Sequence, residues 1–325
     1  MSVFYQSEIV QIIPTGAGVP STYLPTVQSA GISFNVPRQD IQRLGRFAPM
    51  PYRPAAQWPT FSLNVEFVPT GSDVENALGL TGPNSVIDNL SSGNFGYKQA
   101  DYKVQVRDLY GDTSNKGTFN LRSGVITNYS FQASVGQIPR TSFSVEALDI
   151  GFDANSPVLP PTTSDDRPVL RPQDIETHIP TGVIGLNEVH LQSFSISIPL
   201  QRTPLLKIGE AKPFSRELQA PVIAQIQMNA LLESISSTSS PSGDAAQISS
   251  LTCGSWLEDD ITVRIKIPSC DGSYVGDMIT YYISRPYLDN YNISNSVGGY
   301  TSVDLQFSVP LSFERASGEG NLIIY

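Results

Sequence analysis

The sequence has few charged residues and very few of the side chains that usually carry catalysis. Asp, Glu, Lys and Arg make up only 15% of 325 residues, with two histidines and two cysteines. Neither histidine, His178 or His190, stands near a cysteine or carboxylate cluster at metal-ligand spacing. Glycine-rich phosphate loops and nucleophile elbows are also missing. We therefore expect no enzyme, no metal site and no cofactor.

Long apolar runs are missing as well. No stretch is long enough to cross a membrane as a helix, and the first residues do not resemble a signal peptide. Cys253 and Cys270 are then expected to be free thiols, as is usual in a reducing compartment. We expect a protein that is made in a cytosol and has no membrane partner.

Basic residues are fewer than acidic residues. The chain has 20 Lys and Arg against 30 Asp and Glu, which gives a formal charge of −10. Ordinary nucleic-acid binding depends on cations that neutralise phosphates, so this balance argues against it. It does not argue against a surface past which nucleic acid slides without being held.

Alternating apolar and small polar residues are abundant, and one alternating stretch occurs twice. In residues 27–36, Ala30, Ile32 and Phe34 alternate with serine, glycine and asparagine. In residues 191–200, Phe194, Ile196 and Ile198 alternate with serines. This period of two predicts a strand with one buried face and one polar face.

Further matches keep the same order along the two halves of the chain. The paired segments are Ile13–Gly16 with Ile179–Gly182, Leu90–Gly93 with Leu251–Gly254, and Asn128–Gly136 with Asn290–Gly298. The alternation also aligns Leu63 with Ile226, although the prolines at 59 and 221 would favour a shift of one residue. We interpret the chain as a tandem duplication, with a first β domain at 1–152, a Pro-rich linker at 153–173 and a second β domain at 174–325.

The pattern predicts a mainly β fold in which each copy carries one short helix packed on its sheet. The helices are expected at 85–90 and 244–251, each followed by a glycine stop. A Pro-rich and aromatic loop is expected at 47–59. Each half should end in a long antiparallel hairpin whose outer face is polar or acidic and never basic.

This combination resembles the tail-tube protein family of long-tailed bacteriophages. The stretches Val27–Arg38 and Ile126–Gly136 carry the resemblance, which covers both halves. It implies a tail-tube-like β-sandwich or barrel domain, present twice. In the double-domain version three chains form a pseudo-hexameric ring, and each domain adds its sheet edge to a neighbour's.

The resemblance further implies a virion protein that assembles in the host cytoplasm into stacked rings, with DNA as a transient cargo. Sheath, tape-measure and tail-terminator proteins are the other partners it implies. The polar face of the hairpins would line the bore, at Ser130, Gln132, Ser134, Ser144, Glu146, Asn292, Ser294, Asp304 and Gln306. Ring stacking would use the long loops, with Tyr52, Arg53, Trp58 and Arg216.

Two other functions stay open at this point. A tail-tip hub or distal ring protein would keep the same fold but stop at single rings. A carbohydrate-binding β-sandwich adhesin would use Trp58, Tyr52 and nearby acidic residues as a binding cleft.

Overall fold

A computed structural model describes residues 5–14, 21–24, 26–42, 44–45, 55, 57–81, 99–108, 117–153, 171–178, 189–232, 260–268, 274–294, 301–311 and 321–325. Its described elements are almost all antiparallel strands, so the prediction of a mainly β fold is confirmed. The predicted helices at 85–90 and 244–251, most of the linker and both cysteines lie outside the described residues.

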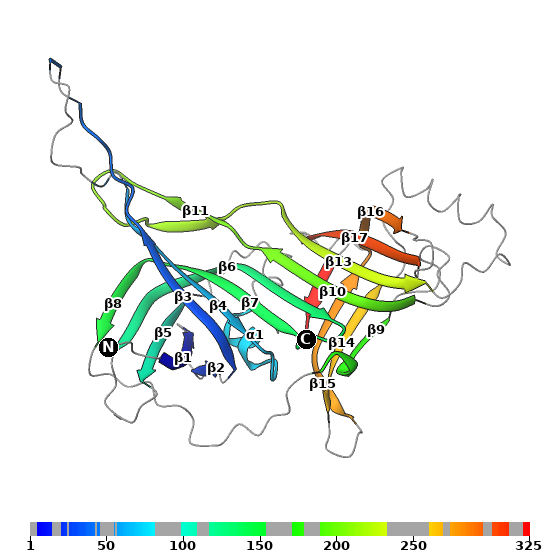
Figure 1. The fold of residues 1–325 in the computed structure, drawn as a ribbon. Coiled ribbons are helices and arrows are strands. Elements are labelled where there is room, and N and C mark those ends of the chain that lie inside the picture. The colour runs from blue at the N-terminus through cyan, green and yellow to red at the C-terminus, as the bar shows by residue number, and fades with distance from the viewer. Residues whose placement is uncertain are drawn as a thin grey trace.

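Eight strands form one continuous curved sheet across the molecule (Figure 1). Four come from the first half: β3 (Val27–Asn35), β4 (Thr60–Phe67), β7 (Arg140–Ala147) and β6 (Thr118–Ser134). Four come from the second half: β10 (Val189–Pro199), β13 (Val222–Leu232), β17 (Thr301–Leu311) and β16 (Tyr287–Ser294). The spatial order is β3-β4-β7-β6-β10-β13-β17-β16, so β6 and β10 form the seam between the halves.

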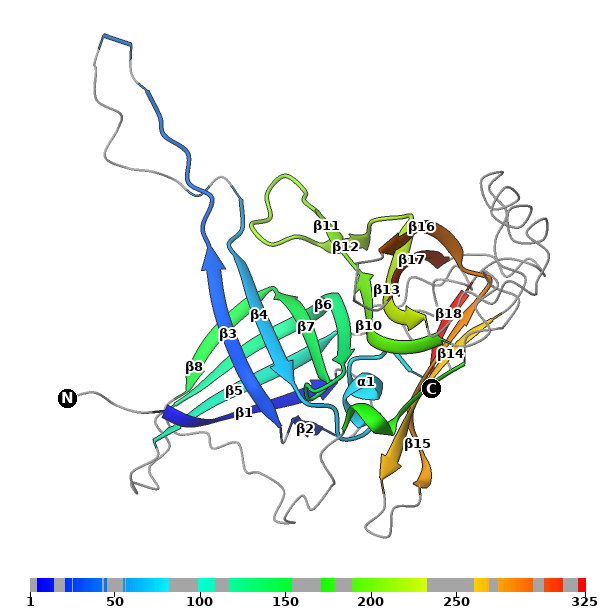
Figure 2. The same ribbon diagram turned by 45° about the vertical axis from the view of Figure 1, so that its right-hand side comes forward.

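A smaller layer of strands accompanies each half of this sheet. In the first half, β2 (Thr22–Leu24), β1 (Tyr5–Pro14), β5 (Ala100–Asp108), the beginning of β6 and β8 (Asp149–Asp153) pair in that order. In the second half, β9 (Ile175–His178), β14 (Ile261–Pro268), β15 (Tyr274–Ser284) and β18 (Asn321–Ile324) pair likewise, after a 3-10 helix, η1 (Pro172–Asp174). A hairpin of β11 (Arg202–Leu205) and β12 (Ser215–Leu218) extends from β10, and the segment that follows β3, residues 36–42, projects away from the rest (Figure 2).

The two halves share strand order and register. Corresponding cross-strand rows in the large sheet are Ile32–Leu63–Val145 and Ile196–Ile226–Phe307. Tyr129 pairs with Phe143 as Tyr291 pairs with Leu305. These rows agree with the alignment of Leu63 with Ile226, in which the core face keeps its side.

A backbone feature recurs at the same point of each half. Ser123 and Arg285 have φ of +51° and +48°, and among the described residues they are the non-glycine positions with positive φ. They are 162 positions apart, the same interval as between Tyr129 and Tyr291. In the first half, β6 passes through Ser123 from the smaller layer into the large sheet. In the second half, Arg285 separates β15 from β16.

The apolar faces of the layers enclose the core. Phe143 packs against Tyr102 of the smaller layer, with ring centroids 6.3 Å apart, and Phe131 packs against Tyr281 at 5.4 Å. Tyr281 belongs to the second half, so the core continues across the seam.

The described helix, α1 (Asp73–Ala77), precedes the predicted segment at 85–90. Asp73 and Glu75 lie in its first turn, where carboxylates interact favourably with the positive end of the helix dipole. Gly79, with φ +75°, ends it in the left-handed region that suits glycine. Val74 and Ala77 are buried in the core, so this short helix packs within the first half. The helix predicted at 85–90 lies outside the described residues.

Within the described residues the large sheet is open. It ends at β3 on one side and at β16 on the other, so no barrel closes within one chain. No helix among the described residues is long and apolar enough to span a membrane.

Gly124 lies where β6 enters the large sheet, and its position predicts a sharp effect of adding one methyl group. A Cβ there would lie 2.6 Å from the Tyr102 ring and 2.7 Å from Val145, both of which are buried. We expect Gly124→Ala to lower the free energy of unfolding by about 1–3 kcal/mol. Gly31→Ala is the matched control, because nothing lies within 4 Å of its Cβ. Urea unfolding measures both, and equal effects would contradict this packing.

Candidate functional site

The large sheet has one apolar face and one polar face, and the polar face is the candidate site. All nine residues predicted to line a bore lie on it: Ser130, Gln132, Ser134, Ser144, Glu146, Asn292, Ser294, Asp304 and Gln306. Their strand neighbours Tyr129, Phe131, Val145 and Leu305 are buried on the opposite side. The alternation of buried and polar residues along each strand accounts for their common face.

The residues predicted from the sequence to line a bore do not include those in the middle of this face. Gln225, Gln227 and Asn229 of β13 and Ser193 and Ser195 of β10 lie between the two predicted groups. The same alternation runs through residues 222–230, so the signal was present. The two predicted groups are therefore parts of one surface that runs across the seam.

The polar face carries almost no positive charge. In the part of the eight strands that belongs to the large sheet, with β6 counted from Gly124, the acidic residues are Glu66, Glu146, Asp289 and Asp304, and the only Lys or Arg is Arg140. Arg122 lies earlier in β6, where the strand belongs to the smaller layer. Arg140 forms an ion pair with Glu66 at 2.7 Å. The face is therefore hydrophilic with a small negative excess.

Short hydroxyl and amide side chains bond to one another across neighbouring strands. Ser33 and Ser62 lie 2.7 Å apart between their Oγ atoms, and Ser130 and Ser142 do the same. At the other end of the sheet, the Ser294 and Ser302 Oγ atoms are 2.6 Å apart, and the Asn229 amide donates to Asp304. These small polar groups satisfy one another in pairs across the strands.

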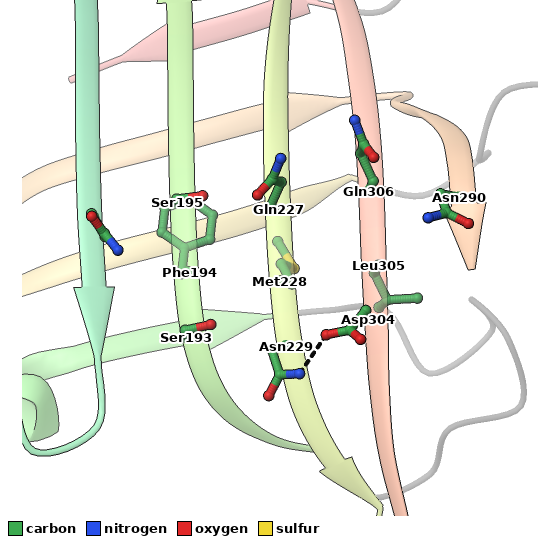
Figure 3. A pocket seen from close by; sticks show the side chains of 11 residues that line it. Ser193, Phe194, Ser195, Gln227, Met228, Asn229, Asn290, Asp304, Leu305 and Gln306 are labelled. Carbon is green, nitrogen blue, oxygen red and sulfur yellow. Dashed lines mark hydrogen bonds between the residues drawn. The ribbon is translucent and has the colours of Figure 1, made fainter. Parts of the chain in front are cut away.

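A hollow of about 350 Å³ lies on the polar face over β10, β13, β17 and β16 (Figure 3). Its rim includes Ser195, Gln227, Asn229, Asp304 and Gln306, whose polar atoms are drawn on the near side of the strands. Amides and hydroxyls of this kind donate and accept hydrogen bonds with water or a polar ligand. The described residues that line the hollow include no histidine or cysteine.

Two of the residues predicted to stack rings make contacts inside the chain. Arg216 of β12 is buried, and its guanidinium donates to the carbonyl oxygens of Glu146, at 2.7 Å, and Ser123. The Trp58 indole donates to the Leu148 carbonyl at 2.8 Å, and Lys212 lies 5.0 Å from its ring centroid. Through these contacts of Arg216 and Lys212, the β11–β12 hairpin and its connecting turn, which belong to the second half, pack against the first half. Tyr52 and Arg53 lie outside the described residues.

These contacts bear on the carbohydrate-binding interpretation. A sugar platform needs an aromatic face open to solvent, whereas Lys212 covers one face of Trp58 and also forms an ion pair with Asp149 at 3.4 Å. Trp58 therefore has a structural role in this arrangement.

A buried polar network joins the halves behind the polar face. The Tyr129 hydroxyl donates to Glu75 Oε1 at 3.1 Å and lies 2.8 Å from the Tyr281 hydroxyl. Within the described part of the chain, Glu75 Oε2 has no hydrogen-bond partner. Burial is the main cause that raises the pKa of Glu75 to about 7, with the nearby charge of Asp73 adding to the rise. Burial also raises the pKa values of Tyr129 and Tyr281.

Both histidines lie on described strands of the second half. His178 lies in β9 and His190 at the start of β10, and both are exposed. Among the described residues, no three His, Cys, Asp or Glu side chains come together in a way that could hold a metal ion.

Comparison with protein-family models gives no match for this chain, and comparison with curated proteins gives none either.

The Glu75 network predicts how stability depends on pH. Between its ordinary pKa of 4.5 and the raised value of about 7, the folded chain holds a proton that the unfolded chain has released. The free energy of unfolding should therefore fall as the pH rises through this window, by about 3 kcal/mol, and change little from this group above pH 7. Glu75→Gln keeps a neutral side chain and should remove this fall.

The measurement is chemical unfolding between pH 4.5 and 8 for both proteins. Glu75→Gln should match the parent at pH 4.5 and exceed it at pH 8. Glu210→Gln, which changes an exposed carboxylate paired with Lys207, is the control and should keep the parent profile. Equal slopes for the parent and Glu75→Gln would show that Glu75 is not buried as described.

Proposed function

We propose that this protein is a structural subunit of the tail tube of a long-tailed bacteriophage, in which three chains form a ring and rings stack around a channel for DNA. The observation that carries the proposal is the polar, almost cation-free face of an eight-stranded sheet whose two edges are open.

The charge of the face suits a wall past which DNA moves. Each phosphate that a Lys or Arg neutralises adds affinity that depends on salt, and such contacts would hold the DNA in place. The polar face has one arginine, already paired with Glu66, and its remaining charges are carboxylates. Serine, asparagine and glutamine side chains keep the wall hydrated without attracting the phosphates.

The open edges suit assembly. A strand at a sheet edge exposes unpaired backbone N–H and C=O groups, and soluble proteins usually cover, charge or shorten such edges. β3 has nine residues with no charged side chain, and β16 has eight with a single carboxylate. Neither strand contains a proline or a lysine, and each has one register irregularity near its start, between Val27 and Ser29 and between Leu288 and Asn290. Because the two edges differ, pairing between copies joins unlike surfaces, which closes into a ring or continues as a filament.

The repetition of the halves supports the tandem duplication and the number of chains. Strand order, cross-strand rows and the positive-φ positions recur in each half. A chain with two equivalent units can occupy two places of a six-unit ring, so three chains complete it. We propose trimeric, pseudo-hexameric rings on this basis and on the family resemblance.

Electron microscopy of the purified protein tests the proposal. We expect rings with a central opening that stack into tubes at high protein concentration. A protein that forms single rings and never tubes would favour the tail-tip hub or distal ring. A protein that stays monomeric at all concentrations, with binding of glycans, would favour the adhesin and contradict a tube.

Cations placed on the wall should convert it into a DNA-binding surface. We expect the double variant Gln132→Lys/Gln227→Lys to raise the affinity of assembled tubes for double-stranded DNA at least about tenfold in 50 mM salt, with a steeper salt dependence. Gln137→Lys, in the exposed turn between β6 and β7, is the control and should have a much smaller effect. Fluorescence anisotropy measures the binding. Strong binding by the parent tube, or equal binding by variant and control, would contradict a non-adhesive bore.

A further inference from the structure

We propose a specific residue register for the contact between copies: β16 of one chain pairs with β3 of the next, antiparallel, with Tyr291 opposite Phe34 and Asn292 opposite Ser33. This inference rests on the proposed ring and deepens it, because it names the residues that meet. It is drawn from the β6–β10 seam, which joins two equivalent edges inside one chain.

The seam supplies the template. β6 and β10 pair antiparallel, with Tyr129 opposite Ile198, Ser130 opposite Ser197 and Phe131 opposite Ile196. Backbone bonds continue the pairing at both ends, from Val135 N to the Gln192 carbonyl at 2.9 Å and from Leu200 N to the Thr127 carbonyl at 2.8 Å.

Each side of the seam has an equivalent at a free edge. β16 occupies the place of β6, because Tyr291 pairs with Leu305 as Tyr129 pairs with Phe143. β3 occupies the place of β10, because Ile32 pairs with Leu63 as Ile196 pairs with Ile226. The two outer strands of the large sheet, β16 and β3, therefore correspond to β6 and β10, the two strands that pair at the seam.

Apolar residues that are buried at the seam have exposed counterparts at the two outer strands. Phe131 and Ile198 are buried at the seam, at 0% exposure each, while their counterparts Ile293 and Phe34 are 45% and 70% exposed. All four belong to the apolar side of the sheet, as their partners Val303 and Phe61 show for the two edge residues. An exposed phenylalanine on one edge and an exposed isoleucine on the other, both on the apolar side of the sheet, fit a second copy of this chain better than a polar ligand.

Transfer of the seam register to the edges gives a consistent interface. On the apolar side, Tyr291 meets Phe34 and Ile293 meets Ile32, as an aromatic pair and an aliphatic pair. On the polar side, Asn292 meets Ser33, which are small polar groups like the Ser130 and Ser197 that they replace. No like charges face each other, so the polar face continues from chain to chain without a break.

Cysteine cross-linking tests the register. In a background with Cys253→Ser and Cys270→Ser, the pair Asn292→Cys/Ser33→Cys places the thiols on directly opposed residues. Opposed Cα atoms in an antiparallel pair lie about 4.5–5.5 Å apart, within disulfide range. The control pair Asn292→Cys/Ser29→Cys shifts one thiol four residues along β3, by about 13 Å, which is out of range.

Mild oxidation followed by non-reducing electrophoresis should give covalent dimers and trimers for the first pair and monomers for the control. Mass photometry of the same samples before oxidation reports whether rings are present. Rings without cross-linking of the first pair, or with equal cross-linking of both pairs, would overturn the register and leave the ring intact. Monomers in mass photometry would overturn both the ring and the register.

Discussion

The unpaired edge of the β-sheet is the constraint on which the rest of the structure depends. An antiparallel sheet with one apolar and one polar face satisfies its core by packing against a second layer, and the smaller layers provide this in each half. Packing of the layers does not provide hydrogen-bond partners for the outward-facing backbone N–H and C=O groups of the first and last strands. Inside the chain, the edge of the first half and the edge of the second half provide these partners for each other where β6 pairs with β10. At β3 and β16 the same problem recurs, and the proposed ring solves it in the same way.

The contacts between the halves keep the sheet continuous at the seam. Arg216 reaches across 70 and 93 positions of sequence to two backbone carbonyls, and hydrogen bonds to a charged donor are stronger than neutral ones. The Glu75, Tyr129 and Tyr281 network joins the helix, the large sheet and the smaller layer of the second half. Truncating one member of such a buried network leaves other polar groups without partners, so the seam depends on all of them. These contacts favour a chain that acts as one unit in assembly, with both halves held in fixed relation.

Much of the large sheet could be predicted from the alternation of side chains. The sides of Ser130, Glu146 and Asp304 follow from a period of two, which leaves no freedom once the apolar positions are buried. The helix α1 was not predicted because its signals are weak: it has five residues, Ser72 makes no side-chain cap, and the helix ends at Gly79. The long-range contacts could not be predicted, because no local pattern says that Arg216 meets Glu146 or that a carboxylate such as Glu75 is buried.

The number of chains in one ring tests the central claim most directly. Native mass spectrometry of the smallest closed assembly, prepared below the concentration at which rings stack, counts the chains. The account predicts three, because each chain supplies two equivalent units of the inner wall. Six chains in the ring would show that the halves do not act as equivalent units, and would contradict the account.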